Sequence, residues 1–144
     1  MREIVTDIDI AATPEDVWGV LMDFAAYPAW NPFVTRIEGA AAVGRRLDVG
    51  LTPPGGKTMG FRPIVTAAEP ERFFQWLGKV GFKGVFDGRH SFRLSPTQRG
   101  TRFEQSERFT GVLAGLILKA IGARTEAGFR AMNEALKGRC EAAG

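Results

Sequence analysis

The sequence is poor in the residues that bind metals and form disulfides, because it has one cysteine, Cys140, and one histidine, His90. A lone cysteine excludes an internal disulfide, and the two residues together are too few for a Cys/His metal cluster. We therefore expect neither a metal ion nor another cofactor.

Long apolar segments are also missing. The first seven residues contain no apolar core of a secretory signal. The longest apolar run, Val112 to Ile121, is interrupted by Gly115 and Lys119 and is too short to cross a bilayer. These features predict a cytoplasmic chain without stable membrane insertion, although the 112–121 run could be either a buried helix or a lid that touches a membrane at a cavity mouth.

Charge of one sign is not concentrated anywhere. The net charge is +3, and no basic block is longer than Arg45-Arg46. Nucleic-acid-binding proteins usually cluster such charge, so we expect no nucleic-acid partner. At 144 residues the chain can bury a core of its own, which predicts a single domain over residues 1–144.

Two common catalytic motifs are absent as well. The segment Pro53-Pro54-Gly55-Gly56-Lys57 lacks the spacing of a phosphate loop and is expected to be a hairpin turn. A Ser-His-acid triad has only His90 as its base, and Ser91 and Ser106 lie on the opposite strand parity from His90 and Glu107. Nucleophilic hydrolysis is therefore not expected.

A short helix is indicated near the start of the chain. Thr13 is a good N-cap, Pro14 suits the first helical position, and an apolar stripe follows, which predicts a helix from 14 to about 23. Pro28 and Pro32 then stop regular helix, so the aromatic segment between them should form a second short helical corner.

Most of the remaining chain has the alternation of strands, and its last part has the period of a helix. The seven predicted strands are Glu3 to Ile10, Phe33 to Glu38, Arg45 to Thr52, Lys57 to Ala67, Arg72 to Lys79, Val85 to Ser95 and Thr101 to Phe109. Short connections rich in proline and glycine, such as Gly81 to Gly84, indicate an antiparallel meander. A long amphipathic helix is predicted from Gly111 to about Cys140. The fold class is thus α+β, with a seven-stranded curved antiparallel sheet wrapped around the C-terminal helix and two short helices after the first strand.

Strand alternation assigns the inner face of this sheet. The inward residues are mostly bulky and apolar: Phe74, Trp76, Phe86, Phe92, Leu94, Phe103 and Phe109. His90, Gln105 and Glu107 have the same parity, and burying them is costly unless each finds a partner. They could be satisfied within the protein, with Glu107 on Arg124 and His90 on a backbone carbonyl. Alternatively, they could be the polar groups of a small-molecule pocket.

Several segments carry a family resemblance in their order along the chain. They are Thr13-Pro14-Glu15-Asp16-Val17-Trp18, Tyr27-Pro28-Ala29-Trp30-Asn31-Pro32-Phe33, Asp87-Gly88-Arg89-His90-Ser91-Phe92, and Gly100-Thr101-Arg102-Phe103 through Phe109-Thr110-Gly111. Together they resemble the polyketide cyclase/dehydrase-like branch of the START/pollen-allergen (SRPBCC) superfamily, whose domains have a helix-grip fold. The resemblance implies a deep apolar cavity between the sheet and the C-terminal helix, which the superfamily uses for lipids, sterols, polyketides and plant hormones. No catalytic motif of the cyclase members can be transferred to residues of this chain.

Three functions follow as hypotheses. The first is binding of a small hydrophobic or amphipathic molecule by Trp30, Phe33, Phe61, Trp76, His90, Phe92, Gln105 and Glu107. The second is a cyclase, dehydratase or isomerase with His90 and Glu107 as an acid/base pair. The third is an interaction protein that resembles the chaperone activators of the superfamily, which a solid interior would favour. Nothing in the sequence selects the ligand or an oligomeric state.

Overall fold

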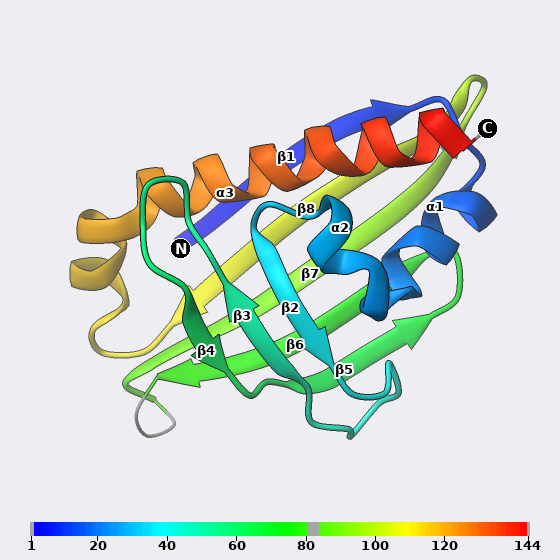
Figure 1. Cartoon of the computed structure of the whole chain (residues 1–144). Coiled ribbons are helices and arrows are strands. Elements are labelled where there is room, and N and C mark those ends of the chain that lie inside the picture. The colour runs from blue at the N-terminus through cyan, green and yellow to red at the C-terminus, as the bar shows by residue number, and fades with distance from the viewer. Residues whose placement is uncertain (1, 81–83, 144) are drawn as a thin grey trace.

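The computed structural model describes residues 2–80 and 84–143, and these residues form two antiparallel sheets, three α-helices and a 3-10 turn (Figure 1). The strands are β1 (Arg2–Ile10), β2 (Val34–Glu38), β3 (Asp48–Leu51), β4 (Met59–Phe61), β5 (Ile64–Glu69), β6 (Phe73–Val80), β7 (Phe86–Thr97) and β8 (Gly100–Thr110). The helices are α1 (Pro14–Met22), α2 (Tyr27–Trp30) and α3 (Ala114–Ala143), and the 3-10 turn covers Phe24–Ala26. The predicted α+β class is confirmed.

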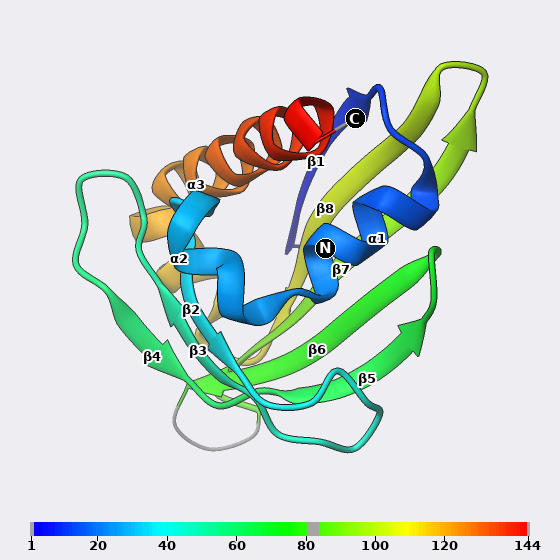
Figure 2. The ribbon, with the colours of Figure 1, turned by 45° about the vertical axis from the view of Figure 1, so that its right-hand side comes forward.

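The five-stranded sheet has the order β1-β8-β7-β6-β5, and the smaller sheet has the order β2-β3-β4. Figure 2 shows the larger sheet curving beneath α3, with α1 and α2 on the same side of it. The long helix runs beside β1 and β8 (Figure 1). Side chains from both sheets and from α3 line a cavity between them.

The number of strands is a correction, because the described residues form eight strands in two sheets, where one seven-stranded sheet was predicted. The predicted strand Lys57 to Ala67 divides at Arg62-Pro63. Proline has no amide hydrogen for a strand ladder. The chain therefore leaves β4, which pairs with β3, and starts β5, which pairs with β6. The predicted turn at Gly81 to Gly84 includes residues 81–83, which lie outside the described residues.

The helix boundaries follow their capping residues. Thr13 Oγ1 accepts a hydrogen bond from the amide of Asp16 at 3.1 Å, and Pro14 occupies the first turn, as predicted. The C-terminal helix begins at Ala114, three residues later than expected, because Gly111 has φ of 117° and cannot belong to a right-handed helix.

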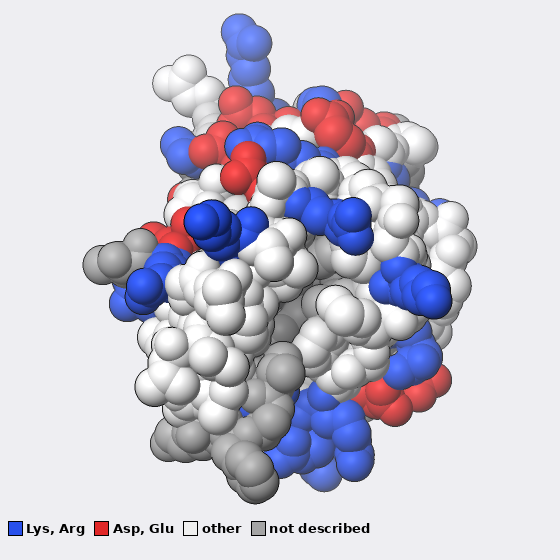
Figure 3. Space-filling view, turned by 90° about the vertical axis from the view of Figure 1, so that its left-hand side faces the viewer, with Lys and Arg blue, Asp and Glu red and all other residues white. Residues whose placement is uncertain are grey.

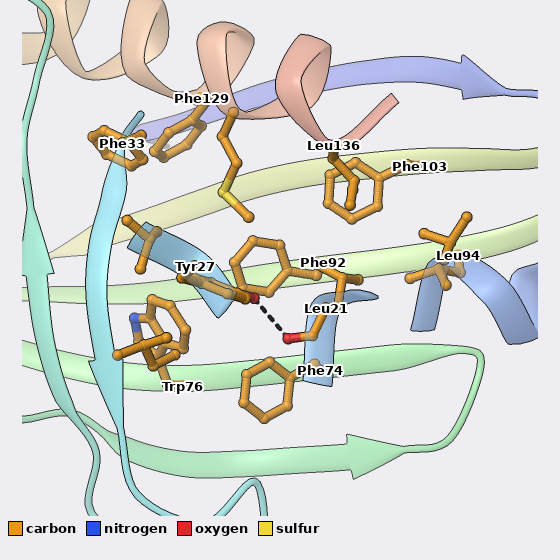
Figure 4. Close-up of a cluster of buried hydrophobic side chains, with 14 of the residues drawn as sticks. Leu21, Tyr27, Phe33, Phe74, Trp76, Phe92, Leu94, Phe103, Phe129 and Leu136 are labelled. Carbon is orange, nitrogen blue, oxygen red and sulfur yellow. Dashed lines mark hydrogen bonds between the residues drawn. The ribbon is translucent and has the colours of Figure 1, made fainter. Parts of the chain in front are cut away.

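The core is aromatic and lies on the concave face of the larger sheet. Figure 4 shows this cluster, in which Phe74 and Phe92 stack at 6.1 Å and Phe92 and Phe103 stack at 6.0 Å. These buried rings occupy the parity that strand alternation assigned to the inner face. Among the described residues, no helix is both long enough and apolar enough to pass through a membrane.

Tyr27, the only tyrosine in the sequence, is a buried part of this core (Figure 4). Its hydroxyl donates to the Leu21 carbonyl at 2.7 Å, and burial, followed by the charge of Asp23, raises the pKa of the phenol well above its usual value. The unfolded chain loses this proton near pH 10 and the folded chain keeps it, so folding stability should fall as the pH rises above about 10.

We therefore expect tyrosinate absorbance to appear only together with alkaline unfolding, as followed by circular dichroism. A Tyr27→Phe variant should lose less stability between neutral and alkaline pH than the wild type. Reversible ionisation near pH 10 in the folded protein would contradict this prediction.

Candidate functional site

A cavity opens between the smaller sheet, the concave face of the larger sheet and the first half of α3. Its lining is mostly apolar and consists of Phe33, Val49, Leu51, Pro53, Met59, Phe61, Pro63, Trp76, Gly78, Lys79, Phe86, Gly88, His90, Glu107, Phe109, Ile121 and Thr125. The cavity volume is about 80 Å³. This is room for several water molecules, each of which needs roughly 10–15 Å³. The space suits one or two rings, or one end of a longer molecule, because aromatic side chains fill the rest of the interior.

Two glycines on neighbouring strands create this space. Gly78 on β6 pairs with Gly88 on β7, and both have inward parity in strands that otherwise present large side chains. A Cβ atom at Gly88 would overlap Oε2 of Glu107, so the glycine allows the carboxylate to lie over the β7 backbone. An isolated glycine within a strand often marks such a close approach.

His90 and Glu107 form the polar wall of the cavity. They are opposite one another on β7 and β8, and His90 Nδ1 lies 3.0 Å from Glu107 Oε1. The histidine is 1% exposed, while the Glu107 side chain is 16% exposed. The imidazole is therefore sealed inside the protein, and the carboxylate is the part of the pair that a ligand can reach.

The other ring nitrogen of His90 faces a buried amide network. His90 Nε2 lies 2.9 Å from Gln105 Oε1, and Gln105 Nε2 donates to Asn133 Oδ1 at 2.8 Å. Asn133 Nδ2 donates to the hydroxyl of Thr6 at 2.8 Å, and this hydroxyl donates back to the Gln105 carbonyl at 2.9 Å. The network joins β1, β8, β7 and α3, and every member has a partner, as a low-dielectric interior requires.

Aromatic rings enclose the imidazole. Trp76 stacks on it with centroids 5.0 Å apart and an interplanar angle of 27°, and Phe129 from α3 meets it at 4.9 Å in an edge arrangement. Such rings exclude water from the imidazole, so its hydrogen bonds are electrostatically strong.

The predicted site residues separate into three groups. Phe33, Phe61, Trp76, His90 and Glu107 line the cavity, and Gln105 lies behind His90. Phe92 is instead a fully buried core residue, and Trp30 packs on Tyr27 with centroids 5.2 Å apart. Neither Trp30 nor Phe92 lines the cavity.

The position of Phe33 has a local cause. Asn31 Oδ1 accepts hydrogen bonds from the amides of Phe33 and Val34, which fixes the turn into β2. The Phe33 ring then packs against Gly128 of α3, where a Cβ atom would overlap it. The aromatic segment between the two prolines therefore contributes Phe33 to the cavity and Tyr27 to the core.

Sequence reasoning missed Gly78, Gly88, Ile121, Thr125 and Asn133. The two strand glycines had a detectable signal, because each interrupts an inward-facing aromatic series. The helix residues had none beyond their general period. The proposed pairing of Glu107 with Arg124 does not occur, since Glu107 contacts His90 and Arg124 is exposed.

The apolar run before and within the start of α3 is only partly buried. Ala114 is buried, but Val112, Leu113 and Leu116 are exposed. Val112 is 85% exposed and Leu116 is 70% exposed. Figure 3 shows this end of the molecule, where uncharged side chains surround a hollow and Lys and Arg side chains lie around them. Of the two alternatives for this run, the buried helix therefore does not hold at these three residues.

Metal-binding clusters and thiols are two further sources of reactive groups. Within residues 2–80 and 84–143, no three His, Cys, Asp or Glu side chains gather where they could bind a metal ion. Cys140 lies outside the cavity lining, and burial, followed by the charges of Asp16 and Glu141, raises the pKa of its thiol to about 11. The thiol therefore stays protonated at neutral pH and is a poor nucleophile.

A sequence profile of the family described as "Polyketide cyclase / dehydrase and lipid transport" matches residues 1–141. The chain belongs to this family. No curated protein is significantly similar to it in sequence.

Solved structures share the fold of this family member. The Zhui aromatase/cyclase from Streptomyces sp. R1128 is 17% identical, with a TM-score of 0.77, and the match covers 97% of this chain and 93% of that one. A START superfamily protein from Mycobacterium smegmatis is 21% identical, with a TM-score of 0.73 and 99% coverage of both chains. The di-domain aromatase/cyclase StfQ of the steffimycin biosynthetic pathway is 17% identical, with a TM-score of 0.76, covering 96% of this chain and 50% of that one. These likenesses establish the fold, and the resemblance inferred from the sequence is confirmed.

Proposed function

We propose that this protein binds a small apolar molecule with one polar end in the cavity between the sheets and the first half of α3. The observation that carries the proposal is the position of Glu107, a partly accessible carboxylate held by a sealed histidine at the wall of an otherwise apolar cavity. An apolar pocket with a few convergent polar groups is the usual form of a small-molecule site. The family description, which includes lipid transport, agrees with this reading.

The proposal is tested by filling the cavity from α3. Ile121→Trp places a large ring in the lining, whereas Ala120→Trp places the same ring at an exposed neighbouring position. We expect Ile121→Trp to weaken binding of naphthalene-sized ligands at least tenfold in calorimetric titrations, and Ala120→Trp to bind like the wild type. Equal binding by both variants would place the ligand elsewhere, and the absence of any binding to the wild type would refute the proposed function.

A second candidate function rests on the contact between His90 and Glu107. A carboxylate and an imidazole 3.0 Å apart can exchange a proton, and Glu107, the accessible member of the pair, could then act as a general acid or base on a bound ketone. The aromatase/cyclases among the structural neighbours make this chemistry relevant.

A small ketone tests the acid/base role without knowledge of the natural substrate. If the pair is catalytic, the protein should accelerate deuterium exchange at the α-carbons of 2-tetralone, as followed by NMR. Glu107→Gln should then remove the acceleration while circular dichroism shows an intact fold. Exchange at the rate of the buffer alone would leave the binding function as the sole proposal.

A further inference from the structure

The buried amide network determines which nitrogen of His90 carries hydrogen. The Phe129 carbonyl can only accept, and Gln105 Nε2 lies 3.4 Å from it as well as 2.8 Å from Asn133 Oδ1. The amide NH₂ of Gln105 must therefore face α3, which turns Oε1 toward His90. A carbonyl oxygen only accepts hydrogen bonds, so His90 Nε2 must be the N–H donor across the 2.9 Å contact.

This tautomer restricts what lies between His90 and Glu107. With Nε2 protonated, Nδ1 either carries a second hydrogen and donates to the carboxylate or accepts from a protonated carboxyl group. In both cases one proton lies along the 3.0 Å line between Nδ1 and Oε1. The remaining arrangement would bring a lone pair of the buried imidazole against a lone pair of the carboxyl oxygen, which is costly.

The other carboxyl oxygen, Oε2, is thereby left as an acceptor. It is a carboxylate oxygen in the first case and the carbonyl oxygen of the acid in the second. It lies over Gly88, a lining residue, and no hydrogen bond to it occurs within the described residues. A ligand that reaches Oε2 must bring a hydrogen-bond donor.

The neighbouring polar groups agree with a hydroxyl as this donor. The Thr125 hydroxyl already donates to the Ile121 carbonyl at 3.0 Å, so its oxygen offers only lone pairs to the cavity. Trp76 adds one donor, its indole N–H. Lys79 also lines the cavity but is exposed to solvent, and among the described residues Glu107 pairs with His90 and not with this lysine.

We propose that Glu107 Oε2 is the acceptor that anchors the polar end of the ligand, and that the ligand is an apolar hydroxyl compound, such as a phenol or an alcohol. Thr6, Asn133 and Gln105 act as positioning residues, because they fix the tautomer of His90 and through it the acceptor character of Glu107. This inference rests on the proposed binding function. It disfavours carboxylates and ethers, because neither offers a hydrogen-bond donor to Oε2.

Three ligands with one ring system test this selectivity: 2-naphthol, 2-methoxynaphthalene and 2-naphthoate. Calorimetric titration should show that the wild type binds 2-naphthol about tenfold more tightly than the methyl ether, since the ether leaves Oε2 without its hydrogen bond. Naphthoate, which also lacks a donor, should likewise bind more weakly than 2-naphthol. Glu107→Leu should abolish the preference for naphthol over the ether, and Glu104→Leu, on the opposite face of β8, should retain it.

The tautomer is tested independently, because His90 is the only histidine and its labelled ring gives a single pair of ¹⁵N signals. We expect Nε2 to have the chemical shift of a protonated nitrogen in the wild type, and this preference to be lost in Gln105→Leu. An unprotonated Nε2, or equal binding of naphthol and its methyl ether, would overturn the inference while leaving the binding function intact. Failure of all three ligands to bind would refute both proposals.

Discussion

Replacing Phe129 with alanine should lower the free energy of unfolding by about 3–5 kcal/mol, the usual cost of deleting a buried aromatic ring. Phe129 on α3 is 0% exposed, and its ring contacts both Phe33 of the cavity wall and His90 of the polar network. Its ring meets Phe33 with centroids 5.6 Å apart and His90 at 4.9 Å, so the variant leaves a void between α3 and both the cavity wall and the polar network.

Urea denaturation followed by circular dichroism measures this loss, and the melting temperature should fall by on the order of 10 °C. Leu116→Ala is the matched control on the same helix, because Leu116 is 70% exposed and its truncation should change stability by less than about 0.5 kcal/mol. A loss below about 1 kcal/mol for Phe129→Ala would show that α3 does not depend on this contact.

A single methyl group at Gly88 is expected to abolish the anchoring of a hydroxyl ligand. The alanine Cβ would overlap Glu107 Oε2 and lie 3.1 Å from Cδ, so the flexible carboxylate must move away from His90. Binding of 2-naphthol should weaken about tenfold, because the ligand hydroxyl loses its acceptor. Because a side-chain terminus and not backbone is displaced, the fold should remain.

Gly78→Ala is the matched control, since it adds the same methyl group to the paired position of β6. The nearest atoms would be the Gly88 carbonyl oxygen and Pro63 Cβ, both at 3.9 Å, which is an ordinary contact distance. Calorimetry should therefore show strong binding by Gly78→Ala and weak binding by Gly88→Ala. If both variants lose binding equally, the loss reflects a narrower cavity and not the displacement of Glu107.

Much of the fold could be predicted because local periods reveal which side of an element is buried. The alternation of β6, β7 and β8 correctly placed Trp76, His90 and Gln105 on the inner face. The caps Thr13 and Pro14 placed the start of α1. The division of one predicted strand at Pro63 was missed, although proline within a strand pattern is a warning of such a break.

The candidate site was predicted in part. The sequence indicated that His90 and Glu107 share a face, but the choice between a pocket wall and an internal ion pair with Arg124 needed the path of the helix. Trp30 and Phe92 were assigned to the cavity, but they do not line it. Strand alternation shows which side chains point inward, but it does not show which of them are covered by other side chains. Whether an inward-facing residue belongs to the core or lines the cavity depends on where α3 packs against the concave face of the sheet.

The sequence by itself determined the fold class, the inward faces of the strands and the family. Strands and helices impose a regular spacing of apolar residues, and this spacing can be recognised within ten or twenty residues. The tertiary structure alone decided that Thr6 would meet Gln105 across 99 positions of the chain and Asn133 across 127. Such contacts depend on how the sheet twists beneath the helix, and no local pattern encodes them. The acceptor character of Glu107 and the hydroxyl ligand inferred from it both arise from these distant contacts.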